Sequence, residues 1–155
     1  MRLRLLMLVV VAAVVGPAAA LGGGASNVAL YASMNGAKEL PKGDPTATGT
    51  AEIKLNAATG KVCWKFTLKG VKGPTAAHIH TGGPGTTGAV IVPFGTAFKR
   101  SGCTTAPKAT INAILAKPPA FYVNVHTAKY PAGAVRGQLS KTEIRKQSLG
   151  GRWTY

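Results

Sequence analysis

Residues 62–69 read Val-Cys-Trp-Lys-Phe-Thr-Leu-Lys, an uninterrupted alternation of two kinds of side chain. Successive side chains of a β-strand point to opposite faces, so every second residue shares a face. One face of this stretch is therefore wholly apolar, whereas the other carries a cysteine, a threonine and two lysines. Such a strand is typical of an antiparallel sheet that packs on a core with one side. We expect that core to contain Val62, Trp64, Phe66 and Leu68.

Shorter strand-like stretches, most of them with the same alternation, lie on both sides of this strand, and glycines and prolines separate them. They occupy residues 28–32, 51–55, 77–80, 90–94, 121–126 and 134–139. Residues 110–116 have apolar side chains at helical spacing, and Pro118 and Pro119 would end such a helix. The sequence therefore predicts an all-β fold, an antiparallel Greek-key sandwich or barrel with one short helix.

The first twenty residues have the layout of an export signal. Met1–Arg4 is basic, Leu5–Val15 is continuously apolar, and Pro17–Ala20 ends in a small-x-small pattern. We expect a signal peptide at residues 1–20, with an uncleaved N-terminal anchor as the alternative. No second apolar run follows, so no transmembrane span is expected after cleavage. A secreted or cell-surface protein would then consist of a flexible lead-in, one domain and a basic tail, at residues 21–27, 28–140 and 141–155.

The chain is strongly basic. Its formal net charge is +15 at pH 7, and loss of Arg2 and Arg4 with the signal would lower this charge to +13. Such a charge favours anionic partners, among which we expect cell-wall or extracellular polymers. The lysines are scattered and no recognition helix is predicted, which argues against specific nucleic-acid binding. A charge that only keeps the protein soluble is the simpler alternative.

Cys63 and Cys103 are the only cysteines in the sequence. In an exported protein an even number of cysteines favours a disulfide, which here would close a loop of about forty residues. Metal ligation by the two thiols is the alternative, but neither cysteine has a histidine near it in the sequence. The pattern therefore favours a disulfide between Cys63 and Cys103.

All three histidines lie in two strand-like segments, Ala77–His80 and Val123–His126. His78 and His80 are two residues apart and therefore share a face. Together with His126 they would form a three-nitrogen site that suits copper or, as second choice, zinc. The alternative is structural: each ring would hold neighbouring loops by hydrogen bonds, and no cofactor would be bound.

Three further residues belong to the same predicted faces. Asn124 and Tyr122 share the face of His126, where Asn124 would orient an imidazole from behind and Tyr122 would do likewise or only pack. Arg136 would hydrogen-bond loop carbonyls or, in an enzyme, act as a catalytic residue that steers an anion towards the metal. The sequence has no paired carboxylates and no nucleophile motif, so any catalysis would depend on the metal.

Three motifs resemble the CHRD domain, which is named after chordin. Ala37–Pro41 resembles its opening segment, residues 76–93 with Ala-Ala-His-Ile-His resemble its first half, and residues 122–139 resemble its closing half. The resemblance spans about residues 28–139. It implies a small exported module of the bacterial single-domain type, and it implies more about the fold than about the function.

A weaker similarity is to the copper site of copper–zinc superoxide dismutases. It consists of the His-x-His strand, a distant histidine and an arginine in a glycine-flanked strand. The similarity implies His78, His80 and His126 as copper ligands and Arg136 as the residue that guides the anionic substrate. The bridging histidine and the zinc ligands of that family have no counterpart, so the similarity extends to a copper-only site at most.

Three functions are compatible with these observations. The first is an exported module with a three-histidine metal site and a binding role at the cell surface or outside the cell. The second is a copper-only enzyme with superoxide dismutase-like activity. The third is a metal-free adhesion module that binds polyanions. Whether the protein is an enzyme stays open at this point.

Overall fold

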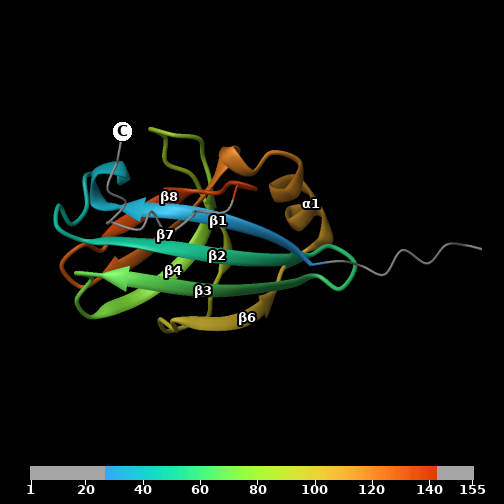
Figure 1. Ribbon diagram of the computed structural model, residues 1–155, viewed down its shortest axis with the longest axis horizontal. Coiled ribbons are helices and arrows are strands. Elements are labelled where there is room, and N and C mark those ends of the chain that lie inside the picture. Colours follow the sequence, from blue (N-terminus) through green and yellow to red (C-terminus); the bar gives the residue numbers. More distant parts are fainter. Residues whose placement is uncertain (1–26, 143–155) are drawn as a thin grey trace, which may run out of the picture.

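The structure is a computed structural model, and it describes residues 27–142 (Figure 1). The predicted signal peptide, the lead-in up to residue 26 and nearly all of the predicted tail lie outside the described residues. Within residues 27–142 the chain forms strands β1 (Val28–Asn35), β2 (Thr48–Asn56), β3 (Lys61–Lys69), β4 (Pro74–Thr81), β5 (Val90–Pro93), β6 (Ser101–Thr105), β7 (Phe121–Thr127) and β8 (Val135–Gln138). It also forms helix α1 (Lys108–Ala116) and two 3₁₀ turns, η1 (Gly36–Lys38) and η2 (Pro118–Ala120).

The described strands form one nearly closed, barrel-like sheet in the order β5-β4-β7-β8-β1-β2-β3-β6. All its strand pairs are antiparallel, and Figure 1 shows β1, β2 and β3 side by side. The predicted all-β class with one short α-helix is confirmed. No helix within the described range is long and apolar enough to cross a membrane.

The alternation in β3 places its apolar face in the interior, as expected. Val62, Trp64 and Phe66 are buried, whereas Leu68 near the strand end is half-buried. The register with β2 sets Trp64 opposite Ile53 and Val62 opposite Leu55, so the inward residues of the two strands pack side by side. Burial of apolar side chains of this size stabilises the fold by about 1.5–3 kcal/mol each.

Strand β6 is an element that the alternation does not reveal. Its sequence Ser-Gly-Cys-Thr-Thr has no apolar face, and it lies at one edge of the sheet. Cys103 of β6 pairs directly with Cys63 of β3, and the two form a disulfide with Cα atoms 4.0 Å apart. The covalent bond thus ties β6 to the sheet where side-chain packing is weak, and the predicted disulfide is present.

Strands β4, β7 and β8 differ from the rest of the barrel because both of their faces are largely buried. Their inner faces carry core residues, among them Ile79, Val123 and Val135. Their outer faces carry a layer of polar and aromatic residues, which we call the outer polar layer: His78, His80, Tyr122, Asn124, His126, Arg136 and Gln138. The strand register sets these residues in adjacent rows, with His80 and Gln138 flanking Tyr122, and His78 and Arg136 flanking Asn124.

Two loops cover the outer polar layer. Residues 82–89 follow β4, and the side chains of Arg136 and Gln138 hold this loop by donating to the carbonyls of Gly83 and Gly82, both at 2.8 Å. Residues 36–47 follow β1, and the Asp44 amide of this loop donates to the Ala134 carbonyl at 2.9 Å. Polar side chains on the outside of the barrel are therefore withdrawn from water.

Candidate metal centre

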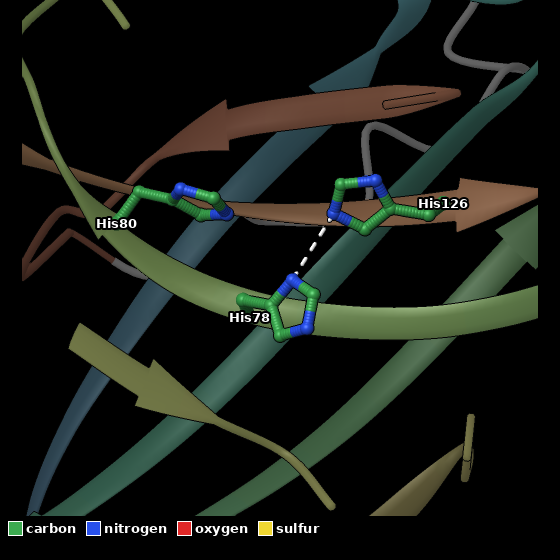
Figure 2. A group of neighbouring side chains, drawn as sticks. All are labelled: His78, His80 and His126. Atoms are coloured by element: carbon green, nitrogen blue, oxygen red, sulfur yellow. Dashed lines mark hydrogen bonds between the residues drawn. The ribbon is translucent and has the colours of Figure 1, made fainter. Parts of the chain in front are cut away.

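The three histidines converge on the outer face of β4 and β7, as Figure 2 shows. One ring nitrogen from each of His78, His80 and His126 lies within 4.8 Å of the other two. The shortest separation joins His78 Nδ1 and His126 Nε2, at 3.1 Å. The convergence arises because β4 and β7 pair in a register that sets His78 opposite Asn124 and His126 opposite Ala76. The three side chains form a group that could hold a metal ion.

In His80 and His126, a backbone carbonyl determines which of the two ring nitrogens carries the proton. His80 Nδ1 lies 3.0 Å from the Gly88 carbonyl oxygen, and His126 Nδ1 lies 2.9 Å from that of Pro131. A carbonyl oxygen only accepts, so each Nδ1 donates its hydrogen. In a neutral imidazole the other nitrogen, Nε2, then carries the lone pair. Both Nε2 atoms face the centre of the cluster, which is the arrangement that orients a metal-binding histidine.

The Asn124 side chain lies between two of the rings. Its Oδ1 is 3.1 Å from His80 Nε2 and 3.1 Å from His126 Nε2. An amide oxygen has lone pairs but no hydrogen, so it cannot satisfy the lone pairs of the two imidazoles. His78 Nδ1 is left to donate to His126 Nε2, and a metal ion that displaced this one hydrogen would meet the nitrogen and oxygen lone pairs that converge here.

Burial keeps the imidazoles in the neutral form that ligates metals. Burial, the largest cause, and the charges of His126 and His80 together lower the pKa of His78 from 6.5 to about 4. Burial also lowers the pKa of His80, against the Gly88 carbonyl oxygen and the Asn124 side chain, both of which favour the protonated ring. At neutral pH both rings are therefore deprotonated and available to a metal ion.

A protein-family comparison matches residues 30–139 to the CHRD domain. The chain belongs to the CHRD domain family. The match covers most of the chain, and it confirms the resemblance drawn from the sequence motifs. No curated protein and no solved structure matches the chain, so the similarity to superoxide dismutases rests on the residue pattern alone.

Tyr122 and Arg136 form a stack behind the histidines of the CHRD domain. The Tyr122 and His80 rings are 4.7 Å apart and within 7° of parallel. Arg136 Cζ lies 3.4 Å from the centroid of the Tyr122 ring. Because β4 and β8 lie on opposite sides of β7, the tyrosine ring separates the guanidinium from His80. Tyr122 therefore packs against a candidate ligand and holds its ring plane.

Arg136 is buried and does not line the centre of the histidine cluster. It is 1 % exposed, and its Nη2 donates to the Gly83 carbonyl at 2.8 Å and to Gln138 Oε1 at 3.2 Å. These contacts match one of the two roles that the sequence predicts for Arg136, which is to hydrogen-bond loop carbonyls. The steering of an anion by Arg136 stays a prediction, and it would have to act through the tyrosine ring or over a longer distance.

Glu39 belongs to the site of this CHRD domain, and the sequence reasoning missed it. It comes from the loop after β1 and is 3 % exposed, which is unusual for a carboxyl group. The side chain of Asn124 and the backbone N–H of Leu40 hydrogen-bond to it. Burial raises the pKa of Glu39 to about 7, against the opposing effects of Arg136 and these two donors. Two features of the sequence could have pointed to Glu39: it lies in the Ala37–Pro41 motif, and the chain has few acidic residues.

Proposed function

We propose that this CHRD domain binds one copper ion through His78 Nδ1, His80 Nε2 and His126 Nε2, with zinc as the second choice. The observation that carries the proposal is the pair of Nδ1–H groups held by the Gly88 and Pro131 carbonyls. A structural role for the histidines does not require the Nε2 atoms of His80 and His126 to be turned towards the same point, beside His78 Nδ1. Imidazole-rich sites suit both metals, and an exported protein meets Cu(II) in an oxidising compartment.

An extracytoplasmic location belongs to the same proposal. The disulfide between Cys63 and Cys103 supports it, because such bonds persist in oxidising compartments. The basic composition supports binding to anionic wall or extracellular polymers. The function that we propose is therefore a metal-binding module that works outside the cytoplasm, at or near the cell surface.

The test is a competition titration of the metal-free protein with Cu(II) and with Zn(II). We expect one equivalent of Cu(II) per chain, and we expect His126→Ala and His78→Ala each to weaken binding by more than 100-fold. Asn112→Ala, on the exposed side of α1, is the control and should bind as the wild type does. Wild-type protein that binds neither metal, or histidine variants that bind as tightly as the control, would contradict the proposal.

A second candidate is superoxide dismutase-like activity of the copper form. One observation favours it: His78 and His126 are only half-buried, so a small molecule could approach the ion from that side. A superoxide assay of the copper-loaded wild type, with His126→Ala as the inactive control, tests this candidate. Arg136→Gln should lower the rate and its dependence on salt if the buried guanidinium attracts the anion. A rate equal to that of free Cu(II) would rule the enzyme out.

A further inference from the structure

We infer that Asn124 supplies a fourth, oxygen ligand to the proposed metal and that Glu39 is the residue that orients it. The inference rests on the proposed three-histidine site and deepens it. Neither residue was assigned this role by the sequence pattern, in which Asn124 stands behind a ligand and Glu39 has no role at all. The structure places both side chains against the histidine cluster.

Three separations among the four donor atoms match those between neighbouring ligands of one ion. His78 Nδ1, His126 Nε2, Asn124 Oδ1 and His80 Nε2 follow one another at separations of 3.1 Å each. Two ligand atoms that are each about 2.1 Å from one ion lie about 3.0–3.4 Å apart when they are neighbours around it. Asn124 Oδ1 therefore takes a position between two imidazoles that a direct ligand would occupy.

The hydrogen bond with Glu39 decides which end of the amide faces the metal. An amide presents either its oxygen or its NH₂ group, and an NH₂ group facing the imidazoles would make Asn124 a purely structural bridge. Here the Asn124 side chain bonds to the Glu39 carboxyl group. With its NH₂ turned to that carboxyl, the amide points Oδ1 at His80 and His126.

Glu39 itself is held in a tight space that costs the fold stability. Its Oε1 is buried without a hydrogen-bond partner among the described residues. A Cβ atom built on Gly133 would collide with this oxygen, so a glycine leaves room for the carboxyl group there. Burying a polar atom unpaired destabilises the folded state. An acid kept in place at such a cost, next to an amide that faces three histidines, is explained by its orienting role.

The resulting donor set is three imidazole nitrogens and one amide oxygen. Four-coordinate sites with mixed nitrogen and oxygen ligands are typical of Cu(II). The oxygen also completes the sphere on the buried side, because Asn124 is 1 % exposed. The half-buried side of the cluster, at His78 and His126, stays available for an exogenous ligand.

The test combines Cu(II) affinity with electron paramagnetic resonance of the copper-loaded protein. Asn124→Ala should weaken Cu(II) binding about 10- to 100-fold and change the g∥ and A∥ values, because one ligand is replaced. Asn112→Ala should change neither quantity. Should Asn124→Ala fail to fold, Asn124→Asp decides, since it keeps both the shape and the oxygen donor. That variant should bind Cu(II) at least as tightly as the wild type.

Glu39→Gln tests the orienting role, with Glu52→Gln at a half-exposed position of β2 as its control. A glutamine can turn either end of its amide to Asn124, so we expect about 10-fold weaker Cu(II) binding for Glu39→Gln and no change for Glu52→Gln. Wild-type affinity and an unchanged spectrum in Asn124→Ala would overturn the fourth ligand while leaving the three-histidine site intact. A wild type that binds no copper would instead overturn both proposals.

Discussion

His78 of the outer polar layer and Glu39 of the loop after β1 have pKa values displaced in opposite directions, and their effects on the stability of the metal-free protein oppose each other. The folded pKa of His78 is about 4, below its ordinary 6.5. Stability from this residue is therefore lost as pH falls from about 6.5 to 4, because the unfolded chain binds the proton first. The folded pKa of Glu39 is about 7, above its ordinary 4.5. Its contribution is present below pH 4.5 and is lost as pH rises to 7.

Replacing Glu39 with glutamine should therefore remove the contribution of Glu39 to the pH dependence of stability and leave that of His78. Metal-free Glu39→Gln should gain stability relative to the wild type as pH rises from 4.5 to 7.5, by an amount on the order of 2 kcal/mol. Urea unfolding of both proteins at several pH values measures the difference. Glu52→Gln, at a half-exposed position of β2, serves as the control. A difference between Glu39→Gln and wild type that is the same at every pH would show that Glu39 does not titrate as stated.

A second prediction at the scale of single residues concerns Gly133. Its φ is 148°, and a Cβ atom there would collide with the Glu39 carboxyl group. Gly73 is the matched control, because its φ is also positive, at 55°, but a Cβ atom there has nothing within 4 Å. Gly73→Ala should lose about 1 kcal/mol for backbone strain alone.

Gly133→Ala should lose about 1–2 kcal/mol more than Gly73→Ala, because the carboxyl group or the loop must move. Chemical denaturation measures both losses, and a Cu(II) titration follows the displaced Glu39 as weaker binding. In a Glu39→Ala background the part of the extra loss that comes from this contact should disappear, and the part that comes from backbone strain at φ 148° should stay. Equal losses for the two glycine variants would mean that the contact with Glu39 is relieved without cost.

At the scale of elements, β6 depends on a covalent bond more than the other strands do. It has no apolar face, pairs with β3 alone and lies at a sheet edge. The disulfide closes 40 residues between Cys63 and Cys103. Chain entropy gives such a crosslink about 4 kcal/mol of stabilisation.

We therefore expect the Cys63→Ser/Cys103→Ser double variant, or the reduced wild type, to melt at a markedly lower temperature. The amide protons of β6 should exchange earlier than those of the neighbouring strands, since an edge strand without an apolar face opens first. Melting curves with and without reductant, together with hydrogen exchange, measure both effects. A melting curve that reductant leaves unchanged would contradict the stabilising role of the bond.

At the scale of the whole molecule, an apolar barrel interior and the outer polar layer share the same three strands. The inner face of β4 and β7 carries residues such as Ile79 and Val125, and the outer face carries the histidines. Mutations of the layer should therefore affect metal binding without removing the core. The outer faces of β2 and β3, which β1 separates from β8 in the strand order, expose Lys54, Lys61, Lys65 and Lys69.

These lysines predict salt-sensitive binding to a polyanion. Binding of soluble polyphosphate should weaken at least 10-fold between 50 and 200 mM salt, because exposed charges are screened within a Debye length of about 10 Å or less. Lys54→Glu/Lys65→Glu should weaken it further while Cu(II) binding stays as in the wild type. Fluorescence anisotropy of labelled polyphosphate measures this, and salt-independent binding would exclude a charge-driven partner.

Much of this architecture could be predicted from local pattern. The period of two in β3 predicted its buried face, and the same rule placed His78 and His80 together and Tyr122, Asn124 and His126 together. A single pair of cysteines was enough to predict the disulfide. Strand β6 escaped because its five residues carry no alternation, so only pairing with β3 identifies it as a strand.

The sequence by itself determined which residues share a face, because side-chain direction along a strand depends on the local backbone alone. The tertiary structure alone decided that β4 pairs with β7 in a register that brings the three imidazoles together. It also decided that the Gly88 and Pro131 carbonyls and the Glu39 carboxyl group reach them from separate loops. Register and loop placement depend on packing between segments far apart in the chain, which no local period encodes.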